Sequence, residues 1–248
     1  MAHRSLIVTA VAAEADSVSA GLGPHLGGPV LLPLPGGPVL RRHTAGPVRV
    51  DVLVGGVGPA AVAAATGTAL TSAALTDPDA PYGLVVSAGI AGGFLPLAPL
   101  GSVVVSASVV AADLGARTPD AYLTVEELGF GRSVHPVPDA LTGRISAALT
   151  AGHLPHAVAP VLTVSTVTGT ADRAAELAGR HPGAGAEAME GFGVAEAAAA
   201  HGLPVVEIRA VSNAVGPRDR AAWRIGDALE SLRRAFELLS STVLVEPS

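Results

Sequence analysis

The chain has 248 residues, a formal net charge of −6, 49% hydrophobic residues, 15% charged residues and no cysteine. Such high hydrophobicity excludes an intrinsically disordered chain, and the lack of cysteine excludes disulfide scaffolds and Cys-ligated metal sites. All 15 basic residues are arginine, which excludes Schiff-base and phosphate-loop lysines and argues against a basic patch for nucleic acid.

Short β-branched runs alternate with Ala-rich stretches along the whole chain. The spacing predicts strands over 5–12, 38–44, 48–55, 83–88, 101–112, 158–168 and 204–212 and helices over 14–22, 59–75, 138–151, 170–181, 190–201 and 220–241. Several of these strands are continuously apolar, as strands covered by helices on both faces are. We therefore predict an α/β fold, a single domain over 1–248 with a mixed central β-sheet flanked by helices. Segments 23–37 and 113–137 are expected to be irregular.

Two segments resemble targeting or membrane elements. Residues 1–17 look like a signal peptide, but their apolar run is short and contains Thr9, which favours a buried first strand. Residues 80–112 carry no charge, but Pro96 and Pro99 interrupt them, so two strands fit better than a membrane helix. We expect a soluble, cytoplasmic protein that does not bind membranes.

A glycine-rich turn follows the strand at 48–55. Residues 56–61, Gly-Val-Gly-Pro-Ala-Ala, match the dinucleotide-binding fingerprint, which is weak when it stands alone. That fingerprint needs an acidic residue at the end of the next strand, and the next strand ends in Ser-Ala-Gly at 87–89. Two other interpretations stay open: a tight turn that packs helix on strand, or backbone N–H groups that face an anionic ligand.

Polar residues at strand ends are the candidate functional groups. Glu14 follows the first strand and Glu190 opens an apolar helix, so each is either a helix N-terminal charge or a group in a ligand crevice. Asn213 ends strand 204–212, where it either caps a turn or binds the edge of a heterocycle. Glu187 is interpreted as a solvated or capping charge.

Four segments in this order resemble the nucleoside phosphorylase superfamily, above all its methylthioadenosine/S-adenosylhomocysteine nucleosidase branch. They are Ala-Val-Ala-Ala-Glu at 10–14, Ser-Ala-Gly-Ile-Ala-Gly-Gly at 87–93, Ala-Met-Glu-Gly at 188–191 and Ile-Arg-Ala-Val-Ser-Asn at 208–213. Segments 112–120, 127–131 and 207–219 are similar, more narrowly, to the futalosine hydrolase family.

The resemblance implies a nucleoside phosphorylase-like fold and an enzyme that hydrolyses the N-glycosidic bond of futalosine. The products would be hypoxanthine and dehypoxanthinyl futalosine, in menaquinone biosynthesis. It also implies a homodimer or larger homo-oligomer and no metal or cofactor. The only metal-like spacing, His153 and His156, has no third histidine or carboxylate nearby, so no metal is expected.

The resemblance also implies roles for particular residues. Glu190 would bind the ribose hydroxyls with Met189 against the sugar, and Glu14 would orient or deprotonate the attacking water. A glycine loop at 89–93 would bring backbone close to the ligand, and Arg209 would either support the water or form a structural ion pair. The implied catalytic residues are Glu14, Glu190 and Asn213, and the implied substrate-binding residues are Gly89, Ile90, Ala91, Gly92, Met189, Arg209, Arg117 and Arg132.

The chain departs from the related branches in three ways. Asn213 replaces the aspartate that protonates the purine, and an amide can satisfy N7 and O6 of a 6-oxopurine together, which favours hypoxanthine over adenine. The stretch Val-Val-Ser-Ala-Gly at 85–89 contains no arginine, whereas the related phosphorylases carry an arginine before this loop to hold phosphate. Water is therefore favoured as the nucleophile. Ile90 replaces a serine, so no hydroxyl can assist the water at that position.

Specificity for the benzoate tail of futalosine is expected in the 113–137 segment. In the nucleosidase branch, the matching segment lies over the 5′ side of the sugar, partly across a dimer interface. Arg117, Arg132 and His135 are candidate carboxylate partners, and the arginines are favoured because they make planar, bidentate contacts. Alternatively, both arginines balance nearby acids on a solvated surface.

The sequence leaves three functions open. One is futalosine hydrolysis. A second is a same-fold adenine nucleosidase or purine nucleoside phosphorylase. The third is a nucleoside-binding protein without catalysis, which would bind its ligand and not turn it over.

Overall fold

A computed structural model describes residues 3–245, and its centre is one ten-stranded sheet. The sheet is mixed, with parallel and antiparallel pairs, which confirms the predicted fold class. Its strands are β1 (His3–Thr9), β2 (Val30–Pro33), β3 (Val39–Ala45), β4 (Val48–Val54), β5 (Leu84–Gly93), β6 (Val103–Ala111), β9 (Val134–Pro136), β10 (His156–Thr163), β11 (Ala186–Ala188) and β12 (Val205–Ala214).

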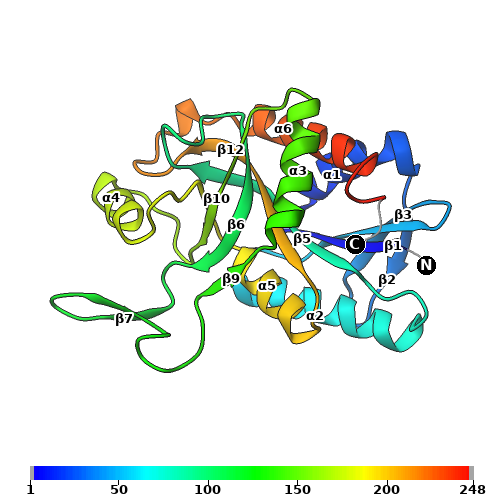
Figure 1. The fold of residues 1–248 in the computed structure, drawn as a ribbon, viewed down its shortest axis with the longest axis horizontal. Coiled ribbons are helices and arrows are strands. Elements are labelled where there is room, and N and C mark those ends of the chain that lie inside the picture. The colour runs from blue at the N-terminus through cyan, green and yellow to red at the C-terminus, as the bar shows by residue number, and fades with distance from the viewer. Residues whose placement is uncertain (1–2, 246–248) are drawn as a thin grey trace.

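Helices cover both faces of this sheet. They are α1 (Ala12–Leu26), α2 (Pro59–Thr76), α3 (Asp139–Ala151), α4 (Ala171–Arg180), α5 (Gly191–Ala200) and α6 (Ile225–Ser240). Helices α1, α3 and α6 lie on one side of the sheet, and α2 and α5 lie on the other (Figure 1). Helix α6 shows why the sequence folds this way: Ala228, Leu232, Ala235 and Leu239 recur at helical spacing and are all buried.

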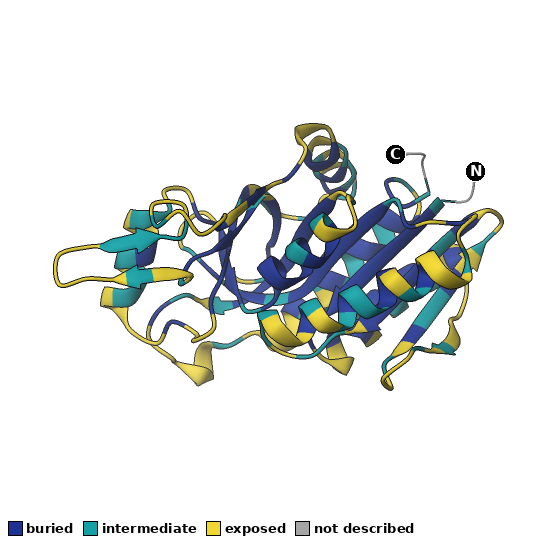
Figure 2. Cartoon of the chain, turned by 90° about the horizontal axis from the view of Figure 1, so that it is seen from below, coloured by how far each residue is buried: buried dark blue, intermediate teal, exposed yellow. Residues whose placement is uncertain are grey.

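The central strands are buried on both faces, as their continuous apolar runs predict. In β1 and β5, Leu6, Ile7, Val85 and Val86 are at most 1% exposed. Figure 2 shows these strands as a buried core beneath partly exposed helices. No helix among residues 3–245 is long and apolar enough to cross a membrane.

The strand order closes part of the sheet on itself. Along the sheet the order is β11-β10-β6-β12-β5-β1-β4-β3-β2, and β11 also pairs with β5. Strands β5, β12, β6, β10 and β11 therefore form a closed ring. The ring brings Gly92 of β5 between Glu187 of β11 and Asn213 of β12.

Strand β5 is longer than predicted, and this corrects the expected glycine loop. The sequence predicts a strand over 83–88 followed by a loop, whereas β5 continues to Gly93. The reason is that residues 89–93 pair with β12, and Gly92 and Gly93 also pair with β11 on the other side. These long-range partners are not visible in the local sequence.

Both segments that were expected to be irregular contain strands. Segment 23–37 begins inside α1, which continues to Leu26, and then forms β2 against β3. Segment 113–137 forms the hairpin β7 (Gly115–Arg117) and β8 (Tyr122–Thr124) and then β9. The hairpin projects from the body of the molecule (Figure 1). The helix predicted from 220 begins at Ile225, after a short 3-10 turn over Arg220–Ala222.

Candidate active site

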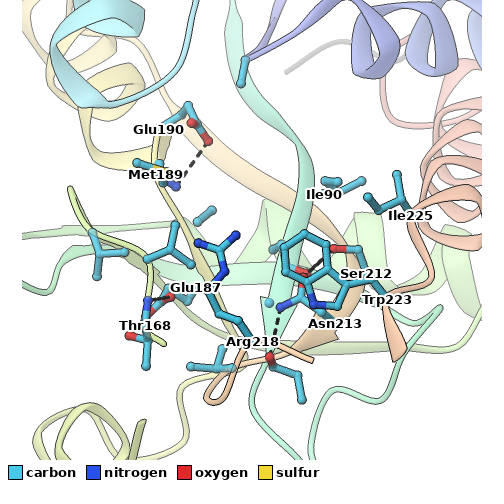
Figure 3. Close-up of a pocket in the computed structure, with 18 of the residues that line it drawn as sticks. Ile90, Thr168, Glu187, Met189, Glu190, Ser212, Asn213, Arg218, Trp223 and Ile225 are labelled. Atoms are coloured by element: carbon cyan, nitrogen blue, oxygen red, sulfur yellow. Dashed lines mark hydrogen bonds between the residues drawn. The ribbon is translucent and has the colours of Figure 1, made fainter. Parts of the chain in front are cut away.

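A cavity of about 270 Å³ opens where β1, β5, β11 and β12 end (Figure 3). This location is the edge at which ligands of open α/β sheets bind. Of the residues implied by the sequence, the cavity is lined by Glu14, Ile90, Ala91, Gly92, Met189, Glu190 and Asn213. Gly89, Arg209, Arg117 and Arg132 do not line it.

Glu14 lies in the first turn of α1 and is only 4% exposed. Its Oε2 accepts hydrogen bonds from the backbone N–H groups of Ala10, at 3.0 Å, and Val11, at 3.3 Å. Its Oε1 accepts from the N–H of Ile90 at 2.9 Å. The carboxylate therefore satisfies backbone donors at a helix start, and it also lines the cavity in a fixed orientation.

Glu190 lies directly before α5 and is 6% exposed. Its Oε1 accepts from the N–H of Gly58 at 3.3 Å, and its Oε2 accepts from the N–H of Met189 at 3.3 Å. Gly58 directly precedes α2, so the glycine turn at 56–58 presents a helix N-terminus to an anion. That anion is the chain's own Glu190 carboxylate.

Arg209 is a buried positive charge beneath the cavity. Its Nε donates to Oε1 of Glu207 at 2.7 Å, and its Nη2 lies 3.1 Å from Oε2 of Glu190. Burial acts to lower the pKa of Arg209, but the charges of Glu207, Glu190 and Glu14 outweigh it and raise that pKa, so the guanidinium stays protonated. Arg209 forms a structural ion pair and also holds the Glu190 carboxylate.

Gly89 makes room for this charge cluster. A Cβ at position 89 would lie 2.5 Å from Oε1 of Glu14 and 2.6 Å from Nη1 of Arg209. Any side chain there would displace both groups. The expectation that Gly89 brings backbone close to the ligand is therefore replaced: Gly89 lets Glu14 and Arg209 approach each other.

Asn213 lies near the end of β12 with its amide in the cavity wall. Its side-chain oxygen accepts from Oγ of Ser212 at 2.9 Å, and its Nδ2 donates to the carbonyl oxygen of Ala214 at 2.9 Å. These contacts fix which end of the amide carries the donor. The amide nitrogen keeps a second N–H, and the amide oxygen keeps a second lone pair, for a ligand.

Comparison with known proteins shows the family of the chain. Residues 7–244 match the family model described as "Phosphorylase superfamily". The chain is 57% identical to futalosine hydrolase of Streptomyces coelicolor, over 95% of this chain and 94% of that protein. The chain belongs to the phosphorylase superfamily, within its futalosine hydrolase family. It is also 44% identical to futalosine hydrolase of Acidothermus cellulolyticus, over 97% of this chain and 92% of that protein.

Solved structures share the fold of this futalosine hydrolase family member. Futalosine hydrolase of Helicobacter pylori superposes with a TM-score of 0.77 at 15% identity, over 97% of this chain and 98% of that one. The methylthioadenosine/S-adenosylhomocysteine nucleosidase of the same organism superposes with a TM-score of 0.74 at 17% identity, over 96% and 97% of the two chains. The nucleoside phosphorylase-like fold implied by the four motifs is confirmed.

The prediction of a solvated or capping role for Glu187 is wrong. Glu187 is 5% exposed and lines the cavity of this phosphorylase-superfamily site. Its Oε1 accepts from the N–H of Thr168 at 2.8 Å, and its Oε2 accepts from Oγ1 of Thr168 at 2.5 Å. Burial raises the pKa of Glu187, although both bonds from Thr168 oppose the shift. In the sequence, Glu187 lies between two alanines, and this position indicates apolar surroundings for its carboxylate.

The two arginines that the sequence favours for the substrate tail do not line the cavity, whereas a third arginine does. Arg117 donates to Glu176 at 2.7 Å, and Arg132 donates to Glu196 at 3.4 Å, both outside the cavity. Arg218 lines the cavity instead, 5.3 Å from the centre of the Trp223 ring. Within residues 3–245, no Asp or Glu lies within ion-pair distance of Arg218.

Nothing in the described part of the chain gathers three or more His, Asp or Glu side chains in a group that could hold a metal ion.

Proposed function

We propose that the chain hydrolyses the N-glycosidic bond of futalosine, releasing hypoxanthine and dehypoxanthinyl futalosine in menaquinone biosynthesis. The observation that carries this proposal is the presence of two fixed carboxylates, Glu14 and Glu190, and one amide, Asn213, in the wall of a single cavity. The futalosine hydrolases to which the chain is similar support the choice of substrate.

The geometry suits a reaction that builds positive charge on the sugar. The Glu190 carboxylate would accept the ribose hydroxyls and stabilise an oxocarbenium-like ribose, with Met189 beside the sugar. The Glu14 carboxylate, held by the N–H groups of Ala10, Val11 and Ile90, would orient water and accept its proton. The remaining N–H of the Asn213 amide would then donate to N7 or O6 of hypoxanthine as this base departs.

The charges next to Glu14 favour water over phosphate as the nucleophile. The nearest cation, Arg209, is already bound to Glu207, Glu190 and Ser87. A phosphate dianion beside Glu14 would therefore meet a carboxylate whose neighbouring cation is already paired.

The substrate panel that tests this proposal is futalosine, inosine and methylthioadenosine, each followed for release of free base. We expect hypoxanthine from futalosine and little or no adenine from methylthioadenosine. Adenine release at the higher rate would instead identify an adenine nucleosidase, and tight binding of futalosine without turnover would identify a binding protein.

We further propose that the protein works in the cytoplasm as a homodimer or larger homo-oligomer. Supporting this is an exposed apolar surface at the base of the β7–β8 hairpin. Leu114 and Phe130 there are 43% and 82% exposed, which is typical of a surface that another chain covers.

Replacing Asn213 with aspartate should move the base preference away from hypoxanthine. An ionised carboxylate would face O6 of hypoxanthine acceptor to acceptor, a repulsion that the amide avoids, whereas a protonated carboxyl could donate to N7 of adenine. The ratio of kcat/KM for futalosine to that for its adenine-bearing counterpart should fall. An unchanged ratio in a variant with the wild-type Tm would mean that Asn213 does not contact the base.

The structure allows the arginine that binds the benzoate tail to be identified by substitution. The sequence favours Arg117 and Arg132, whereas Arg218 lines the cavity beside an indole ring on which an aromatic tail could stack. Removing the arginine that binds the carboxylate of the tail should cost about 1.5–3 kcal/mol of binding free energy. We expect Arg218→Ala to raise KM for futalosine but not for inosine, which lacks the tail, with Arg117→Ala and Arg132→Ala as matched controls. A selective loss at Arg117 or Arg132 would assign the tail to the hairpin segment.

A further inference from the structure

Glu207 is a buried carboxylate beneath the cavity, and the proposed reaction gives it no role. Its side chain is 0% exposed and does not line the cavity, so a ligand in the cavity does not touch it. Its Oε1 accepts a hydrogen bond from Nε of Arg209 at 2.7 Å. Among residues 3–245, no group forms a hydrogen bond to its Oε2. A Cβ on Gly191 would overlap this oxygen, so the glycine leaves the space that the carboxylate fills.

Arg209 connects Glu207 to the two carboxylates that line the cavity. Nη2 of Arg209 lies 3.1 Å from Oε2 of Glu190. Its Nη1 and Oε1 of Glu14 lie 2.6 and 2.5 Å from the place where a Cβ of residue 89 would be, so these two atoms are at most about 5 Å apart. One guanidinium therefore lies among three carboxylates, two at the cavity and one on the far side from it.

The fixed charge of Arg209 decides the ionisation of Glu207. Burial raises the pKa of Glu207, and the nearby charge of Glu190 adds to that rise. The charge and the hydrogen bond of Arg209 oppose it. On the strand beside it, Ser106 contributes only a neutral hydroxyl, which accepts from the Glu207 backbone N–H at 2.7 Å. Because the guanidinium stays protonated at 2.7 Å, it holds the carboxylate ionised near neutral pH.

The charge of Arg209 matters for a reaction that builds positive charge on the sugar. The ribose of a bound nucleoside is neutral, whereas the oxocarbenium-like transition state is cationic. A guanidinium directly beneath the cavity would oppose that charge and weaken the effect of the carboxylates at its surface. A carboxylate on the far side of the guanidinium offsets it. An amide would accept the Nε–H of Arg209 equally well, so the hydrogen bond alone does not account for a full buried charge at Glu207.

We propose that Glu207 is a positioning residue that acts through Arg209. It fixes Nε of the guanidinium, which directs Nη2 toward Glu190, and it offsets the positive charge of Arg209, so that the cavity binds a cationic ribose better than a neutral one. This inference rests on the proposed function and adds a source of transition-state stabilisation that never touches the substrate.

Two ligands that differ in one ring atom measure this preference. One carries 9-deazahypoxanthine, joined through a methylene group, on a hydroxylated pyrrolidine whose ring nitrogen is protonated near neutral pH. The other has cyclopentane in place of pyrrolidine and is uncharged. In both, the base is joined by carbon–carbon bonds, so neither is hydrolysed. The wild type should bind the pyrrolidine ligand more tightly by calorimetry, because it mimics the cationic sugar.

Glu207→Gln removes the charge and keeps an oxygen for Nε of Arg209. We expect the preference for the pyrrolidine ligand to fall about 10-fold, the effect of one charge roughly 10 Å away at an effective dielectric constant of about 20. Affinity for the cyclopentane ligand should not change. Equal losses for the two ligands, or no loss for either, would overturn the proposal.

Glu207→Asp keeps the charge and should keep the preference close to that of the wild type. A folded Glu207→Asp protein without the preference would contradict the proposal, which is therefore testable even where Glu207→Gln does not fold.

Asp51→Asn is the matched control. Asp51 is also 0% exposed and pairs with Arg4 and Arg42, but it does not line the cavity or contact Arg209. This variant should have a lower Tm and an unchanged preference, and the same fall as in Glu207→Gln would overturn a specific role for Glu207. A protein that does not cleave futalosine, but whose preference for the pyrrolidine ligand falls in Glu207→Gln, would contradict the proposed reaction alone.

Discussion

Arg209→Ala is expected to destabilise the protein by about 3–5 kcal/mol, the cost of removing one partner of a buried ion pair. The side chains of Arg209 and Glu207 are 1% and 0% exposed, and Glu190 and Glu14 lie close to the same guanidinium. Without the arginine, Glu207 would be a buried carboxylate with no positive charge beside it. Burial already raises the pKa of Glu207 despite Arg209, so the variant should keep Glu207 protonated over a wider pH range.

Urea unfolding of the variant and wild type measures this loss as a change in the free energy of unfolding. Arg233→Ala is the matched control, because Arg233 binds Glu230 and Glu237 on the partly exposed surface of α6. Surface pairs of this kind contribute about 0–1 kcal/mol. Similar losses for the two variants would show that the buried cluster has no special part in stability.

Glu190→Gln should lower kcat for futalosine by about 10²–10³-fold, the range for removing one preorganised electrostatic group. The carboxylate can accept from both ribose hydroxyls and stabilise positive charge on the sugar, and the neutral amide does this poorly. The amide would also weaken the contact of Glu190 with Arg209, 3.1 Å away in the present structure. Steady-state kinetics on futalosine measure the loss.

The variant must be shown to be folded for this result to count. Its Tm should stay within a few degrees of the wild type, since glutamine keeps the volume of the side chain. Glu230→Gln should retain full activity. Turnover close to wild type in a folded Glu190→Gln protein would remove Glu190 from the reaction.

Much of this site could be predicted because its residues follow strongly apolar strands. Glu14 and Asn213 each stand at the end of such a strand, and the carboxyl ends of strands are where ligand crevices form. Glu190 was recognisable for a related reason, as a charge at the start of an apolar helix. These positions depend on local patterns, which a single sequence contains.

Glu187 was misjudged because its environment depends on residues far away in the sequence. Strand β11 has only three residues, Ala-Glu-Ala, and no β-branched side chain marks it as a strand. Its pairing with β10 and β5 buries Glu187, and neither pairing has a local signal. The extension of β5 to Gly93 was missed for the same reason.

Arg218 illustrates a further limit. It lies in the segment Gly-Pro-Arg-Asp-Arg at 216–220, and this composition is typical of a solvated turn. Whether such a turn folds over a cavity depends on the contacts of the whole chain, here including the approach of Arg218 to Trp223. Arg117 and Arg132 looked equally suitable in sequence, and only the structure places them against Glu176 and Glu196.

The most direct test of the proposed reaction is the release of hypoxanthine from futalosine in phosphate-free buffer. We predict one molecule of hypoxanthine and one of dehypoxanthinyl futalosine for each futalosine consumed, at a rate that added phosphate does not increase. No release without phosphate, with a sugar phosphate as product when it is added, would contradict hydrolysis and identify a phosphorylase.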